Sequence, residues 1–444
     1  MLSQLAQKLW GKFESKEEFL KFVRLAAIFA FTIGVYWLLN STKDVVFLHT
    51  VGLDYLPYAK MFSLILMIPT IMLYGHLVDE VPRHRVFYIV CIGYAIISCV
   101  LGLALMHPAI GLTNTVLNKW RLVGWCWYAF VESFGSIIVA LFWSFAADTS
   151  TPESAKRGFS IIALGAQIGG VLGPLLFHKS ALCWGPAPFA FVGAGGMLMI
   201  ALLVFYFMWV TPNSELVGFH TEQKTAVYRT PKTGFFEGLK LIASSGYLIG
   251  IVLVVTLYEV IATILEFHVK TLAKMSYGSS INDLNAFFFK YAICANGMAL
   301  ISLLLGAGAI GRNLGLLRTL LLLPTLIALG MAAITVHFTL WTTLAVLIIV
   351  KGLNYALNQP AKEQLYIPTS TTSKYKAKAW IDMFGSRMAK GAGSSVHILR
   401  SVLQSSFVGV SSLISGGLVV MWIFAAFFVG NAHEKAVKED KTIC

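Results

Sequence analysis

The stretch TPNSELVGFHTEQKTAVYRTPKTGFF, residues 211–236, is a long polar interruption in an otherwise strongly apolar chain. It carries Lys224, Arg229 and Lys232, whereas the residues on both sides of it form repeated apolar runs. A run of about 20 apolar residues is long enough to cross the hydrocarbon core of a bilayer as a helix. The number of such runs before and after this stretch therefore decides the architecture.

The composition excludes a soluble protein. Of 444 residues, 57% are hydrophobic and only 12% are charged, and the mean hydropathy is +0.75. We therefore expect an all-α membrane protein with about twelve transmembrane helices, six on each side of the polar stretch. The predicted spans are 22–41, 57–78, 86–106, 123–145, 159–177, 187–210, 247–267, 286–307, 318–336, 340–358, 379–398 and 407–430.

Positive charge predicts the orientation. Most of the 34 Lys and Arg residues fall in cytoplasmic segments if both termini lie inside, which agrees with the positive-inside rule. We expect a multi-pass protein of the cell inner membrane that functions as a monomer. The basic flanks are interpreted as solvated segments beside anionic lipid, and they require no nucleic-acid partner. They comprise Lys8, Lys12, Lys16, Lys21 and Arg24 at the start and Lys435, Lys438 and Lys441 at the end.

Six helices on each side of a central loop are the layout of the major facilitator superfamily, whose halves are related repeats around a midplane site. The predicted domains are residues 1–210, a cytoplasmic linker 211–240, and residues 241–444. The loop sequence GHLVDEVPRHR, residues 75–85, resembles the gate signature of that superfamily. Its Asp79, Arg83 and Arg85 are either gate residues or ordinary positive-inside residues.

Polar residues at helical spacing form stripes on three predicted spans. Such stripes cannot face lipid, so each faces a partner helix or a water-filled cavity. Lysine ammonium groups beside amides suit a charged oxyanion, and phosphate is the obvious candidate. A structural alternative pairs Glu266 with Lys270 and places Lys43 with Asp44 at the headgroups. The stripes are Tyr36, Asn40 and Lys43; Glu259, Thr263, Glu266 and Lys270; and Lys351, Asn354, Asn358 and Lys362.

Four motifs, in order along the chain, resemble those of the ATP/ADP translocase family, the nucleotide transporters of plastids and obligate intracellular bacteria. The resemblance extends from about residue 22 to 430. The motifs are LLNSTKD at 38–44, ESFGSIIVALFW at 132–143, LEFHVK at 265–270, and NQPAKEQLYIP at 358–368 followed by KAKAWID at 376–382.

The resemblance implies ATP/ADP antiport, or exchange of other nucleotides, by alternating access. It also implies that Lys43 and Lys362 bind the phosphates, and that Glu132 and Glu266 hold these lysines apart or pair with them in the empty carrier. The alternatives are a proton-coupled importer of nucleoside triphosphates or of a dinucleotide and, more distantly, a major facilitator transporter of another organic anion.

The chain departs from the family pattern on the expected site face, notably at Asn40 and Glu259. Glu259 either binds a proton that couples transport to the proton gradient or is a packing carboxylate. Asp382, Arg387 and Lys390 on the eleventh span are further candidates for lining the site. The sequence contains no phosphate-binding glycine loop, catalytic triad or metal-ligand spacing, so we expect no enzyme activity, cofactor or metal.

Overall fold

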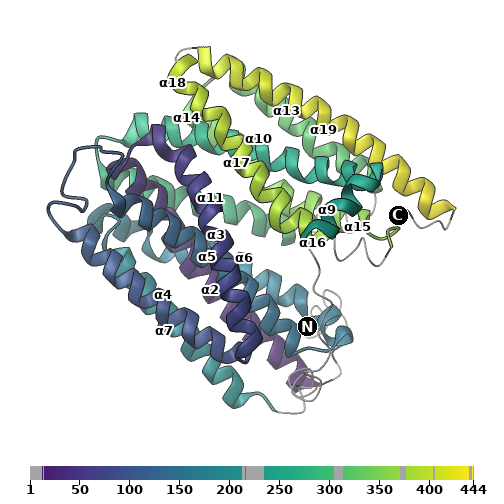
Figure 1. Cartoon of the computed structure of the whole chain (residues 1–444), viewed down its shortest axis with the longest axis horizontal. Helices are drawn as coiled ribbons and strands as arrows, with labels where there is room; N and C mark the ends of the chain where they lie inside the picture. The colour runs from purple at the N-terminus through teal and green to yellow at the C-terminus, as the bar shows by residue number, and fades with distance from the viewer. Residues whose placement is uncertain are drawn as a thin grey trace. The chain divides into compact units, whose positions relative to one another are not determined.

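The computed structural model describes residues 13, 15–212, 216, 235–304, 314–370, 377–403, 406–439 and 443. The chain divides into two compact units, the first formed by Met1–Tyr228 and Tyr277–Gly297 and the second by Arg229–Ser276 and Met298–Cys444. Most of the predicted linker 211–240 lies outside the described residues, so the domain boundaries remain predictions. Figure 1 shows the helices that make up each unit.

Unit 1 contains six long helices and the first part of a seventh. The six are α2 (Lys16–Thr50), α3 (Leu56–Glu80), α4 (Arg83–Met106), α5 (Leu122–Asp148), α6 (Pro152–Trp184) and α7 (Pro188–Val210), and the seventh is α11 (Ile281–Leu304). Unit 2 contains α9 (Phe235–Ser244), α10 (Gly246–Tyr277), the end of α11, α13 (Leu316–Val336), α14 (Leu340–Leu353), α15 (Gln359–Leu365), α16 (Lys378–Trp380), α17 (Ser386–Val396), α18 (Arg400–Leu403) and α19 (Phe407–Lys438).

Small residues bring α2 and α6 into direct backbone contact. A Cβ atom built on Gly169 would lie 1.8 Å from the carbonyl oxygen of Ala30, and one on Gly173 would lie 2.3 Å from that of Gly34. A Cβ on Gly165 would lie 2.5 Å from the carbonyl oxygen of Ala26. Residues spaced by four occupy one helix face, and small ones there allow two membrane helices to approach closely. These glycines allow the close packing of α2 and α6, which fixes the polar stripe of α2 within unit 1.

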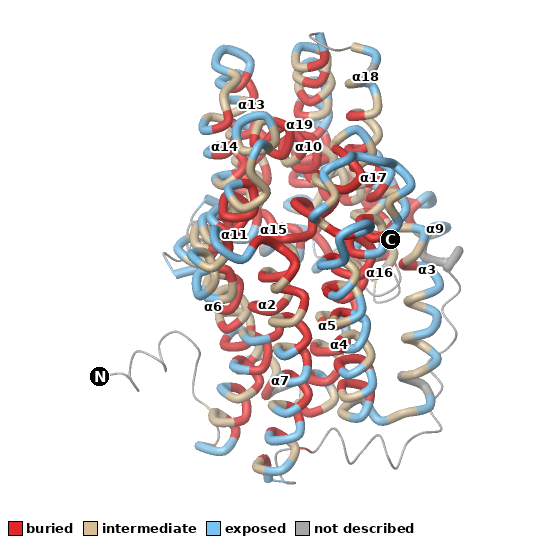
Figure 2. The backbone as a smooth tube through the Cα atoms, turned by 90° about the vertical axis from the view of Figure 1, so that its left-hand side faces the viewer, coloured by how far each residue is buried: buried red, intermediate tan, exposed pale blue. Residues whose placement is uncertain are grey.

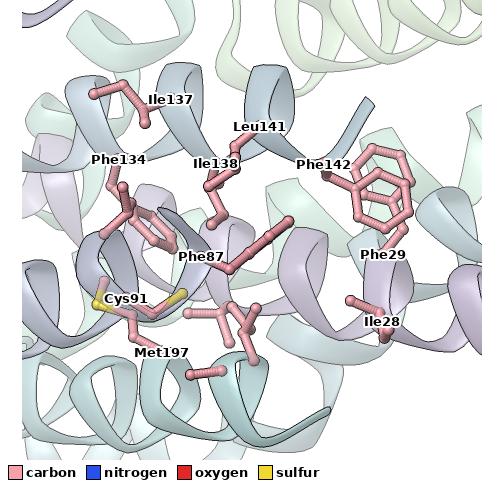
Figure 3. Close-up of a cluster of buried hydrophobic side chains, with 14 of the residues drawn as sticks. Ile28, Phe29, Phe87, Cys91, Phe134, Ile137, Ile138, Leu141, Phe142 and Met197 are labelled. Atoms are coloured by element: carbon pink, nitrogen blue, oxygen red, sulfur yellow. The ribbon is translucent and has the colours of Figure 1, made fainter. Parts of the chain in front are cut away.

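Aromatic and branched side chains of α2, α4, α5 and α7 fill the core of unit 1 (Figure 3). The rings of Phe29 and Phe142 stack with centroids 4.1 Å apart, and Phe87 meets Phe145 edge to face at 5.5 Å. Such packing supplies dispersion contacts that lipid tails cannot match at an irregular helix surface. It fixes α5, and with it Glu132, against α2.

Large apolar side chains cover the outward faces of the helices. In Figure 2, α3 is drawn mostly in the colours of exposed and intermediate residues, and its Met72 and Leu73 are 71% and 70% exposed. Exposure on that scale is stable only where lipid replaces water. Ten helices of the described chain are long and apolar enough to cross a membrane. The protein is therefore a multi-pass, all-α membrane protein.

Two of the twelve predicted spans form interrupted helices. The predicted span 340–358 is α14 followed by a π-helical turn at Asn354–Asn358, and α15 begins immediately after it. Pro360 has no backbone N–H to continue the regular hydrogen-bond ladder, and the helical hydrogen-bond pattern changes just before it. The predicted span 379–398 contains a second π-helical turn, Ile381–Gly385, between α16 and α17. π-turns of this kind are frequent at functional sites.

The basic flank before the first predicted span is only partly solvated. Lys21 is 2% exposed, and its ammonium group donates to the carbonyl oxygen of Thr149 at 3.2 Å. Glu18 is 3% exposed and accepts two hydrogen bonds from Arg157. The expectation of a solvated flank is therefore wrong for Lys21. The reason is that α2 begins at Lys16, so the turn bearing these residues packs against the ends of α5 and α6.

Candidate functional site

The site in unit 1 centres on Lys43 of α2. Its ammonium group forms an ion pair with Glu132 of α5, and the Lys43 side chain is only 7% exposed. The same ammonium group lies over the ring of Tyr128, 4.9 Å from the centroid. Tyr128 and Glu132 are four residues apart and so share one face of α5. A lysine buried within a bundle of apolar helices is stabilised by a carboxylate and an aromatic ring beside its ammonium group.

The rest of the α2 stripe lies beside this ion pair. Tyr36 and Asn40 are half-buried, whereas Lys43 and Asp44 are buried. A Cβ atom on Gly135 would lie 2.2 Å from a ring carbon of Tyr36, so the glycine leaves the space that this ring occupies. The glycine of the 132–143 motif therefore positions an aromatic side chain of the stripe.

In unit 2, Glu266 has a lysine partner that the sequence did not indicate. The Glu266 carboxylate of α10 pairs with Lys351 of α14. Glu266 is expected to hold Lys362 apart or to pair with it. Lys362 lies beyond the π-helical turn, on α15, and the role of Glu266 toward it stays a prediction. Lys270, which the structural alternative pairs with Glu266, is buried in α10.

Lys362 is held by an aromatic ring. The residue is 5% exposed, and its ammonium group lies 5.3 Å from the ring centroid of Tyr258, which is itself 4% exposed. Among the described residues Lys362 forms no ion pair. In the preceding π-helical turn, the Asn358 amide donates to the Asn354 side-chain oxygen at 2.8 Å, and both residues are buried. Lys362 is therefore a buried cation beside amide groups.

The eleventh predicted span contributes charges around this cation. Lys390 of α17 lies 3.7 Å from Glu259 of α10, and Lys378 of α16 pairs with Glu363 at 2.5 Å. Asp382 is exposed, and Arg387 is half-buried. Thr263 is buried where α17 meets α10, since a Cβ on Gly393 would lie 2.9 Å from the Cβ of Thr263. The structure thus gathers Glu259, Thr263 and Lys390 where α10 and α17 pack.

The two units share an arrangement. In each unit a lysine–glutamate ion pair joins two helices, α2 and α5 in unit 1 and α10 and α14 in unit 2. In each unit, too, a buried lysine lies over a buried tyrosine ring. Sequence reasoning missed both tyrosines. The spacing of Tyr128 and Glu132 on one helix face is the signal that could have identified the first.

The gate motif is described only in part. Asp79 lies near the end of α3 and Arg83 begins α4, but their side chains are outside the described part of the chain. Arg85 is exposed. The role of this motif therefore remains a prediction.

The chemistry available at these sites is recognition of an anion. Ammonium groups supply positive charge and donors, and the neighbouring amides offer further hydrogen bonds. Within the residues that the structure describes, no group of three or more His, Cys, Asp or Glu could hold a metal ion. The arrangement places ammonium groups beside carboxylates and aromatic rings in each unit.

Comparisons with known proteins agree with this chemistry. A family model described as "TLC ATP/ADP transporter" matches residues 1–341 and 325–433. The chain is 25% identical to "ADP,ATP carrier protein 2, chloroplastic" of Arabidopsis thaliana, over 95% of this chain and 76% of that protein. It is 23% identical to "ADP,ATP carrier protein 1" of Chlamydia muridarum, over 96% of this chain and 92% of that protein.

Solved structures give the fold. A mutant of the peptide transporter POT matches with a TM-score of 0.60 at 13% identity, over 93% of this chain and 95% of the transporter. Identity this low shows the fold alone. The expected all-α, major facilitator-like membrane fold is confirmed.

Proposed function

Because this chain belongs to the TLC ATP/ADP transporter family, we propose that it carries nucleotides across a membrane and that it exchanges ATP for ADP. The observation that carries the proposal is the family match along nearly the whole chain, joined to a buried lysine in each unit. A buried cation in a membrane helix costs free energy, so its presence points to a function. Phosphate is the substrate group that such cations bind.

In the proposed mechanism Lys43 and Lys362 bind the phosphates. Lys362 has its charge available, because it lies over Tyr258 and has no ion pair among the described residues. Lys43 must exchange the Glu132 carboxylate for a phosphate oxygen. The exchange keeps the cation partnered in both states, which lowers the desolvation cost of each. A carrier that reorients best with a partnered lysine favours exchange over net flux.

The proposal includes the setting of the transporter. Both termini face the cytoplasm, the membrane is a cell inner membrane, and one chain is the working unit. Asp79, Arg83 and Arg85 contribute to the gate between two six-helix domains, 1–210 and 241–444, joined by the linker 211–240. The competing functions are proton-coupled import of a nucleoside triphosphate or dinucleotide and transport of another organic anion.

Uptake into liposomes containing the purified chain tests the proposal. We expect radiolabelled ATP to enter only when the liposomes are preloaded with ADP or ATP, and unlabelled nucleoside to compete poorly because it lacks phosphate. Lys43→Met and Lys362→Met should each lose exchange, whereas Lys435→Met, an exposed lysine of α19, should keep it. Uptake without internal nucleotide that collapses with a protonophore would favour proton coupling, and no nucleotide uptake at all would refute the proposal.

A further inference from the structure

The loop between α4 and α5, His107–Arg121, exposes large apolar side chains. Val116 is 67% exposed and Trp120 is 75% exposed, and Ile110 and Leu117 are more than half exposed. Leu122, the first residue of α5, is 71% exposed. A loop in water would bury or replace such side chains.

Arg121 holds the loop in one shape. Its guanidinium group donates to the carbonyl oxygens of Asn114 at 2.9 Å, Val116 at 3.0 Å and Ile110 at 3.2 Å, and it also donates to that of Gly111. Four carbonyl groups from two parts of the loop therefore converge on one planar cation. These bonds hold the loop backbone that carries the apolar side chains.

The same loop is fastened to the end of α2. The backbone N–H of Asn118 donates to the carbonyl oxygen of Thr50 at 3.1 Å, and a ring nitrogen of His49 lies 3.1 Å from the carbonyl oxygen of Leu112. One side of the loop is thus attached to the protein. The side bearing Val116 and Trp120 remains exposed.

The exposed side continues an apolar stripe on α4. Ile89, Ile92, Ile96, Val100 and Leu103 recur every three or four residues, and each is between 46% and 63% exposed. This spacing defines one helix face, and in a membrane-spanning helix such a face contacts lipid. The loop begins at His107, four residues after Leu103, so it starts at the end of this lipid-facing surface.

The loop also carries the chemistry of a membrane interface. The ammonium group of Lys119 lies 5.3 Å from the ring centroid of Trp120. Tryptophan rings concentrate at the level of the lipid headgroups, and lysine extends from there to phosphate. We propose that the α4–α5 loop is an interfacial anchor that lies on the lipid bilayer, with Trp120 among the headgroups and Lys119 against lipid phosphate. The partner of this surface is lipid, and its role is separate from nucleotide binding.

Fluorescence quenching in liposomes tests the anchor. An NBD fluorophore is attached at Leu117→Cys in the full chain with its six native cysteines replaced by serine or alanine. We expect blue-shifted emission that phospholipids brominated near the top of the acyl chain quench strongly, and that aqueous iodide quenches weakly. Val116→Cys repeats the measurement at a neighbouring exposed position, so that misfolding of one variant does not decide the result.

The matched control is the same fluorophore at Lys438→Cys, at the exposed charged end of α19. That site should show the reverse pattern, with strong iodide quenching and weak quenching by brominated lipid. The proposal is overturned if both loop sites behave like Lys438→Cys. It is equally overturned if brominated lipid has no effect and energy transfer between labelled chains shows a second copy on the loop.

Discussion

The ammonium group of Lys351 on α14 forms the ion pair with Glu266 of α10, while Lys362 lies over the ring of Tyr258. Two lysines of one interrupted helix thus have different partners. The pairing neutralises Glu266 within unit 2. In the proposed mechanism, the positive charge of Lys362 then remains for a substrate anion, which a Glu266–Lys362 pair would have cancelled.

This division of roles predicts the effect of removing Lys351. Lys351→Met deprives Glu266 of that partner, and the remaining negative charge disfavours an anionic substrate. We expect the KM for ATP to rise by about tenfold or more, which corresponds to at least about 1.4 kcal/mol. Initial rates of exchange in ADP-loaded liposomes measure it.

A double variant is the control for this prediction. Lys351→Met combined with Glu266→Gln removes both charges, so exchange should recover much of its original KM. A double variant that is as impaired as Lys351→Met would show that Lys351 has a role beyond neutralising Glu266.

Tyr258 should act through its ring and not its hydroxyl group. Tyr258→Phe keeps the ring beneath Lys362, and we expect exchange close to that of the original chain. Tyr258→Leu removes an interaction worth up to about 2 kcal/mol for a desolvated cation, so the KM for ATP should rise by roughly tenfold. A KM that rises equally in both variants would assign the effect to the hydroxyl group instead.

The sequence allowed the positions of the important charges to be predicted but not all of their partners. Lys43, Glu132, Glu266 and Lys362 are visible because charges in apolar spans are rare and costly. The Lys43–Glu132 pair joins residues 89 apart, and its geometry follows from the close packing of whole helices. Periodicity along one helix carries no information about which neighbour a side chain meets.

The sequence did not indicate Lys351 as a partner of Glu266, although both residues belong to the predicted polar stripes. A regular helix would place Lys351 and Lys362 on the same face, three turns apart. That separation along the axis is enough for the two lysines to meet different residues of α10, and a π-helical turn also lies between them. Pro360 signals a break, but the sequence does not show how the break is accommodated.

Glu259 offers a test of proton coupling. Its carboxylate lies 3.7 Å from the Lys390 ammonium group, so the carboxylate already has a cationic partner in the protein. We therefore expect ATP/ADP exchange by the original chain and by Glu259→Gln to be equally insensitive to a protonophore. Parallel uptake assays with and without the protonophore measure this. Loss of a protonophore effect specifically in Glu259→Gln would establish Glu259 as the proton-binding group.

The contact between α2 and α6 should be intolerant of even one methyl group. Gly169→Ala would place a Cβ atom 1.8 Å from the backbone oxygen of Ala30, and backbone cannot rotate away as a side chain can. The helices must separate, which at the scale of overpacked cores costs about 1–3 kcal/mol and displaces Lys43 from Glu132. We expect a lower midpoint of thermal unfolding in detergent together with reduced exchange.

The matched control is Gly195→Ala on α7, where nothing lies within 4 Å of the new Cβ and the midpoint should stay the same or rise. Equal midpoints for the two variants would show that the contact between α2 and α6 is looser than the structure indicates.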